Sequence, residues 1–136
     1  AGLAVARRSG GKPALEGKPP AGLLLLDTFG ELREVYAAAD LVFIGGSLVE
    51  HGGHNPVEPL YAGRRVYIGP HTHKFARMME ELKAYVTQVD AEGLEAAWDK
   101  ALCGKLPPQE KEIGPAIRKK YGEVSAKLAK AVEWAD

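Results

Sequence analysis

Residues 45–60, with the sequence GGSLVEHGGHNPVEPL, place glycines, histidines, an Asn-Pro pair and two glutamates between two apolar runs. A connection that only joins a strand to a helix typically needs about 2 to 6 residues. Glycine has no Cβ to hold a ligand away, and the free N–H groups at a helix start attract anions. The segment therefore predicts a phosphate or carboxylate site, with phosphate close to the amides around Gly53.

Asn55, Pro56 and Glu58 have the spacing of a helix start. Asn55 can accept a hydrogen bond from a free amide of the next turn, Pro56 suits the first helical position, and Glu58 can reach back to the cap. This structural interpretation stands beside a functional one. One turn into the helix, Glu58 is well placed to accept hydrogen bonds from sugar hydroxyls, as acidic residues do for ribose in dinucleotide folds.

A second loop of the same kind, LDTFGEL, follows the apolar run Leu23–Leu26. We expect Asp27 or Thr28 to cap the helix that Glu31 opens, and Gly30 to let the backbone approach a ligand. Phe29 has two interpretations of equal weight. It either lies against a flat base or packs in the core at the end of the strand.

The histidines form two close pairs, His51 with His54 and His71 with His73. A catalytic zinc usually has three protein ligands, and no helical HExxH arrangement holds these side chains. We therefore expect no metal site. Cys103 has no second cysteine to pair with, and we interpret it as structural.

The elements that must position these loops alternate along the chain. Helical patterns separate the later members of a series of short apolar runs, which suits strands of a parallel sheet covered on both faces. The pattern predicts a doubly wound α/β fold, whose ligands bind beyond the carboxyl ends of the strands. The expected strands are Leu3–Ala6, Leu23–Leu26, Leu41–Ile44, Arg65–Ile68 and Tyr85–Val89, and residues 109–136 are expected to form a terminal helix.

The composition fits one soluble domain over residues 1–136. Lys plus Arg and Asp plus Glu number 18 each, so the formal net charge is zero and no global field attracts nucleic acid. No apolar run approaches the roughly 20 residues that span a bilayer. The chain starts with Ala-Gly, and we expect it to be part of a longer protein, with self-association as one consequence of an uncovered surface.

Three segments together resemble one enzyme family. DTFGEL, ADLVFIGGSLVEHGGHNPVEPL and GPHTHKF closely resemble segments of 3-deoxy-D-manno-octulosonic acid (Kdo) transferases. The resemblance runs from the start of the chain to the helix after Phe75. It implies the Rossmann-like C-terminal domain of a GT-B glycosyltransferase.

The resemblance also implies a function for the longer protein, namely inverting transfer of Kdo from CMP-Kdo to the lipid A precursor without a cofactor or metal. It places the full-length protein at the cytoplasmic face of the inner membrane. The general base, the membrane anchor and a Pro-Arg element that helps to hold CMP would lie outside this chain, which would contain no catalytic residue. The implied CMP contacts are Phe29, Gly30, Glu31, Asn55, Pro56, Val57 and Glu58, with Ser47, Gly53 and His54 as candidate additional donor contacts.

The sequence departs from the family at a few positions. The family usually has Met in place of Phe29, Arg in place of His51, and Phe-Asn in place of His73 and Lys74. Two alternatives stay open. The chain could belong to another GT-B nucleotide-sugar transferase or epimerase, or it could be a stand-alone module that binds nucleotides or anions.

Overall fold

The computed structural model describes residues 4–10 and 22–122 of the chain. The chain divides into two compact units, Ala1–Val35 and Tyr36–Asp136, and each is described here by itself. The expected single domain over residues 1–136 stays a prediction.

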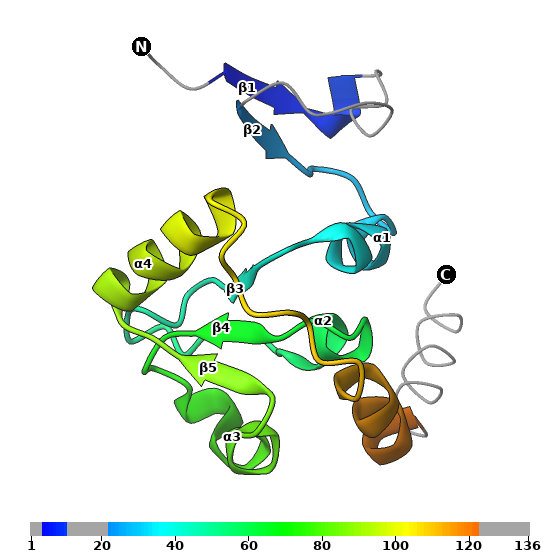
Figure 1. Ribbon diagram of the computed structural model, residues 1–136, viewed down its shortest axis with the longest axis vertical. Helices are drawn as coiled ribbons and strands as arrows, with labels where there is room; N and C mark the ends of the chain where they lie inside the picture. Colours follow the sequence, from blue (N-terminus) through cyan, green and yellow to red (C-terminus); the bar gives the residue numbers. More distant parts are fainter. Residues whose placement is uncertain (1–3, 11–21, 123–136) are drawn as a thin grey trace. The chain divides into compact units, whose positions relative to one another are not determined.

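The first unit contains two parallel strands, β1 (Ala4–Arg7) and β2 (Gly22–Leu25), with the short 3-10 helix η1 (Arg8–Gly10) directly after β1 (Figure 1). Val5 lies opposite Leu23 in the register of the pair. The side chains of Val5, Leu23 and Leu25 are exposed. Because both strands run in the same direction, the segments that follow them lie at the same edge of this small sheet.

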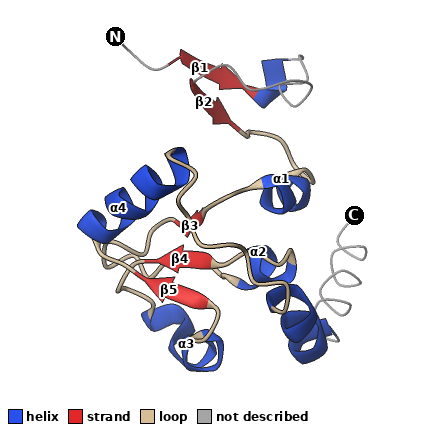
Figure 2. Cartoon of the chain, in the orientation of Figure 1, coloured by secondary structure: helices blue, strands red, loops and turns tan. Residues whose placement is uncertain are grey.

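The second unit is built on a three-stranded parallel sheet in the order β3-β4-β5 (Figure 2). Val66 of β4 lies between Val42 of β3 and Val86 of β5 in the register. The helices between these strands are short, and α4, which follows β5, has 12 residues. The bounds are β3 Val42–Ile44, α2 Val57–Tyr61, β4 Val66–Ile68, η2 His73–Phe75, α3 Ala76–Leu82, β5 Val86–Gln88 and α4 Ala91–Leu102, and residues 113–122 are also helical.

The core of the second unit forms where these helices pack against the sheet. Val66, Ile68 and Leu60 are completely buried, as are Ile113 and Ile117 of the helix at residues 113–122. Burying a side chain of this kind contributes about 1.5–3 kcal/mol relative to leaving it exposed. The sheet and its loop connections are therefore held by apolar contacts from several distant parts of the sequence.

Helix α1 (Leu32–Ala38) joins the two units in sequence. In the sequence, Leu32, Val35, Tyr36 and Ala39 recur at three- and four-residue steps, which predicts one apolar stripe on this helix. Tyr36 and Ala39 pack against the core of the second unit, whereas the side chain of Leu32 is 42% exposed. The stripe prediction was therefore wrong at Leu32. The helix has seven residues, and none of them is fully buried.

The α/β class with parallel strands is confirmed, and all five expected strands form within one residue of the predicted bounds. The strands pair as two sheets. In the expected terminal helix, Ile117 is buried and Tyr121 is half-buried, while Val124, Leu128, Val132 and Trp134 lie outside the described residues. Within residues 4–10 and 22–122, no helix is long and apolar enough to cross a membrane.

Candidate functional site

The loop after β3 folds back on itself through its glycines. The N–H of Gly53 donates to the carbonyl of Gly46 over 3.0 Å, and Gly46, Gly52 and Gly53 all have positive φ. A Cβ on Gly52 would lie 2.9 Å from the Nε2 atom of His73. These glycines are required by the loop itself. The Gly53 N–H is bonded within the loop, and the phosphate site expected close to the amides around Gly53 stays a prediction.

Ser47 connects this loop to the loop after β4. Its side chain is completely buried, and its hydroxyl donates to the carbonyl of Ile44 over 2.5 Å and accepts from the N–H of Gly69 over 2.8 Å. Its carbonyl accepts from the N–H of His71 over 3.0 Å. Ser47 thus has a structural role in joining the two loops, and the donor contact expected from the sequence stays a prediction.

Helix α2 begins at Val57 with Pro56 as its N-cap, one residue later than expected, and Asn55 bonds to the first helical residue. The Oδ1 atom of Asn55 accepts from the N–H of Val57 over 3.0 Å, and the carbonyl of Pro56 accepts from the N–H of Leu60 over 3.4 Å. The reciprocal half of the predicted capping box is absent, because the Glu58 carboxylate forms no hydrogen bond to the Asn55 N–H or to any other described residue. Glu58 is exposed and free to accept hydrogen bonds from a ligand.

The negative charge of Glu58 affects the pKa of a neighbouring side chain, Tyr36. The pKa of Tyr36 is raised, first by burial of its hydroxyl and then by the negative charge of Glu58, since both disfavour the tyrosinate. Helix α2 has only five residues, so few peptide dipoles add up at its N-terminus. The electrostatic potential at the start of this helix therefore comes mainly from the Glu58 carboxylate.

The histidines of the loops are mostly accessible. His51 and His54 are exposed, with ring centroids 6.2 Å apart. Nowhere in residues 4–10 and 22–122 do three His, Cys, Asp or Glu side chains gather closely enough to hold a metal ion. Cys103 directly follows α4 and is exposed, so the interpretation of it as a structural residue has no support from burial.

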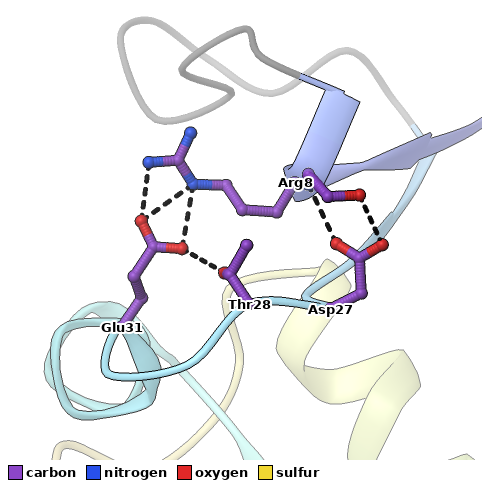
Figure 3. Close-up of polar contacts among 5 residues, drawn as sticks. Arg8, Asp27, Thr28 and Glu31 are labelled. Carbon is purple, nitrogen blue, oxygen red and sulfur yellow. Dashed lines mark hydrogen bonds and ion pairs between the residues drawn. The ribbon is translucent and has the colours of Figure 1, made fainter.

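In the first unit, the segment after β1 is joined to the loop after β2 by an ion pair (Figure 3). The Nη2 atom of Arg8 lies 2.6 Å from Oε1 of Glu31, and Nε of Arg8 donates to both carboxylate oxygens, over 2.9 and 3.1 Å. The hydroxyl of Thr28 also donates to this carboxylate. Both charged side chains are partly exposed. The hydrogen bond from Arg8, followed by that from Thr28, lowers the pKa of Glu31.

A second contact joins the same two segments. The carboxylate of Asp27 accepts from the backbone N–H of Ser9 over 2.9 Å and from its hydroxyl over 2.6 Å, and these bonds lower the pKa of Asp27 (Figure 3). Either Asp27 or Thr28 was expected to cap α1. That prediction was wrong, because Ser9 occupies the carboxylate of Asp27 and Glu31 accepts the hydroxyl of Thr28.

Between these anchored residues the loop presents Phe29 and Gly30. The side chain of Phe29 is fully exposed, which excludes the core interpretation of this residue. Gly30 has a φ of 86°, and an added Cβ there would meet no heavy atom within 4 Å. The surroundings of Gly30 are open, so its backbone is accessible to a ligand.

The expected site residues thus form two groups, residues 29–31 in the first unit and residues 55–58 in the second. The sequence interpretation missed Arg8 and Ser9, which hold the first group, and Gly69, which helps to hold the loop before the second. A signal for Arg8 was available. It follows one parallel strand as Glu31 follows the next, and such segments lie at the same edge of a sheet.

Comparison with known proteins gives several matches. The chain is 42% identical over 102 residues to 3-deoxy-D-manno-octulosonic acid transferase of Bordetella pertussis, which covers 75% of this chain and 23% of that protein. It is 43% identical over 88 residues to the transferase of the same name from Haemophilus influenzae, covering 61% of this chain and 20% of that protein. The chain therefore spans less than a quarter of these relatives. No protein-family model matches it.

A solved structure matches the fold as well. It is the C-terminal CMP-Kdo binding domain of WaaA from Acinetobacter baumannii, with a TM-score of 0.67 and 29% sequence identity. The match covers 86% of this chain and 60% of that domain. These comparisons confirm the resemblance predicted from the sequence: the chain is similar in sequence to the Kdo transferases, and in sequence and fold to a CMP-Kdo binding domain.

Proposed function

We propose that this chain is the donor-binding domain of a Kdo transferase and binds CMP-Kdo. The observation that carries the proposal is its likeness to the CMP-Kdo binding domain of WaaA, which extends over 86% of the chain at 29% identity. Likeness in both fold and sequence argues for function more strongly than fold alone, because many unrelated activities share one fold.

Asn55, Pro56, Val57 and Glu58 are the proposed nucleotide contacts in the second unit. The exposed carboxylate of Glu58 has no hydrogen-bond partner among the described residues, and a charged acceptor of this kind suits ribose hydroxyls. Exposed His54 remains a proposed additional contact to the donor. Gly53 and Ser47 support this loop from within, through the bonds described above.

Phe29, Gly30 and Glu31 are the proposed contacts in the first unit. The exposed ring of Phe29 offers a face on which a cytosine base can stack, a contact worth about 1–3 kcal/mol per base in nucleic-acid complexes. The carboxylate of Glu31 already accepts bonds from Arg8 and Thr28. We therefore expect Glu31 to contact the nucleotide through its backbone N–H.

The whole transferase would need more than this chain. We propose that transfer of Kdo to the lipid A precursor takes place in a longer protein, at the cytoplasmic face of the inner membrane, whose N-terminal domain supplies the general base and the lipid acceptor site. In this proposal the chain contributes no catalytic residue and needs no cofactor. The chain covers only 23% and 20% of the two relatives, which supports the proposal that another domain supplies the general base and the acceptor site.

A nucleotide titration followed by amide NMR tests the proposal. We expect CMP to shift the amide signals of Gly30, Asn55 and Val57, and UMP to bind more weakly, because the exocyclic amine of cytosine donates a hydrogen bond where the uracil oxygen only accepts. UDP binding more tightly than CMP would favour another GT-B transferase or epimerase. Shifts confined to residues 113–122 would contradict the site assignment.

A further inference from the structure

An open pocket of about 310 Å³ lies at the opposite end of the three-stranded sheet from the loop after β3. Gly63 and Arg64 line it directly before β4 begins, so it lies at the amino end of this strand. Its other wall comes from Lys111, Gly114 and Arg118, at the start of the helix at residues 113–122. That helix lies beside α2 (Figure 1), and the Nη1 atom of Arg118 donates to the carbonyl of Tyr61 over 2.9 Å.

The floor of this pocket is made of backbone. Gly63 has a φ of 81°, and a Cβ built on it would come within 3.9 Å of the amide nitrogen of Gly114. A Cβ on Gly114 would lie 2.9 Å from Nη1 and 3.2 Å from Nη2 of Arg118. The guanidinium of Arg118 therefore rests directly on the Gly114 backbone, and a larger residue at this position would displace it.

The charge around the pocket is unbalanced. Arg64, Lys111 and Arg118 bring three cations, and the carboxylate of Glu110 lines the same pocket but already accepts a hydrogen bond from Arg65. Within the described residues, neither Arg64, Lys111 nor Arg118 forms an ion pair with a carboxylate.

Each guanidinium also has a backbone carbonyl as hydrogen-bond partner. Arg64 donates to the carbonyl of Ala37 and Arg118 to that of Tyr61, so each keeps further N–H groups for a ligand. Arg118 in addition lies over the ring of Tyr61, 5.7 Å from its centroid. These contacts lower the cost of ordering the two arginine side chains when a ligand binds.

We propose that this pocket binds a phosphate group carried by an organic substituent. Guanidinium forks match phosphate oxygens in pairs, and a pocket of about 300 Å³ or more is the usual size for a small organic ligand. The substituent is either a small molecule or a lipid, since both present the same phosphate chemistry. The site is independent of the proposed CMP-Kdo site, which lies at the carboxyl end of the strands.

The test uses amide NMR of the whole chain with inorganic phosphate, glycerol 3-phosphate, and vesicles of phosphatidylglycerol or of phosphatidylcholine. We expect phosphate and glycerol 3-phosphate to shift Gly63 and Gly114, with affinity falling about tenfold in Arg118→Gln, the effect of one charge-assisted hydrogen bond. A response to phosphatidylglycerol vesicles that exceeds the response to glycerol 3-phosphate identifies the lipid source, and the reverse identifies a small molecule.

Two further variants keep the test decisive if Arg118→Gln lowers stability. Lys111→Gln removes an exposed cation, and Gly114→Ala pushes the Arg118 guanidinium away while favouring the helix. Both should weaken phosphate binding, and Lys100→Gln on α4 should not. Absence of shifts at Gly63 and Gly114 with every probe at tens of millimolar, or equal affinity in all variants, overturns the proposal.

Discussion

Glu58 and Glu31 both lie close to the start of a short helix, but their carboxylates have different surroundings. The carboxylate of Glu31 is occupied by Arg8 and Thr28, whereas that of Glu58 is exposed and forms no hydrogen bond in the described part of the chain. A glutamate that stabilises the fold is expected to be bonded in the free protein. Glu58 is therefore the better candidate for a ligand contact through its carboxylate. We expect substitution of Glu58 to change ligand binding, and substitution of the partners of Glu31 to change the titration of Glu31.

Replacing Glu58 by Gln should leave stability almost unchanged and weaken CMP binding. Hydrogen bonds to a charged group contribute about 1.5–3 kcal/mol, against about 1 kcal/mol for neutral pairs, so the expected loss is about 0.5–2 kcal/mol. Calorimetric titration with CMP and a thermal melt of each variant measure the two effects. Glu95→Gln on the exposed face of α4 is the matched control. Unchanged affinity with a lowered melting temperature would assign Glu58 to the fold alone.

Replacing the partners of Glu31 should change its titration. Its pKa is lowered below the ordinary 4.5 chiefly by Arg8 and secondly by Thr28, so the folded state binds fewer protons than the unfolded state. This stabilises the first unit above pH 4.5, and the contribution disappears as the pH falls through the lowered pKa.

Carbon-13 NMR of the carboxyl groups follows this titration directly. We expect Arg8→Gln to raise the pKa of Glu31 more than Thr28→Ala does, because the hydrogen bond from Arg8 is the larger cause. An identical titration curve for Glu31 in the wild-type chain and both variants would show that the ion pair does not form in solution.

At the scale of elements, two loops depend on one buried serine. Ser47→Ala removes the acceptor for the Gly69 N–H, and a buried donor without a partner costs about 1–3 kcal/mol. We expect the free energy of unfolding, measured with urea, to fall by this amount. Val49→Ala is the control, since Val49 lies in the same loop with 61% of its side chain exposed. Equal effects of the two substitutions would argue against the role of Ser47.

The sequence predicted elements better than the contacts between them. Continuous apolar runs such as Val42–Ile44 and Val66–Ile68 identify buried parallel strands, and Asn55 indicated the start of α2 to within one residue. The pairing of Arg8 with Glu31 joins residues 23 positions apart, and local patterns do not specify such pairs. The glycines of the loop after β3 were assigned to a ligand, because composition does not reveal that His73 and Lys74 lie against Gly52.

At the scale of the whole molecule, the two sheets should differ in how readily they open. The three-stranded sheet has completely buried Val66 and Ile68, whereas Val5 and Leu23 of the two-stranded sheet are 64% and 57% exposed. Two paired strands alone are marginally stable in water. We expect hydrogen exchange measured by mass spectrometry to be faster in β1 and β2 than in β3 to β5. Equal protection in both sheets would show that they open together.

Self-association stays a prediction at the same scale. Exposed apolar side chains in both units, among them Leu25 of β2 and Leu102 of α4, offer surface that a second protein chain could cover. Analytical ultracentrifugation over a range of concentrations measures this directly. A sedimentation coefficient independent of concentration, at the value for a monomer, would contradict it.

The bonds of Ser47 also bear on the thermodynamics of ligand capture. Because Ser47 joins the loop after β3 to the loop after β4, and Gly53 closes the former on Gly46, residues 45–56 are largely preorganised in the free chain. Fixing the backbone of one flexible residue costs about 1–2 kcal/mol of conformational entropy. A loop that is already ordered avoids most of this cost, so a nucleotide that binds as proposed would lose little of its affinity to ordering residues 45–56.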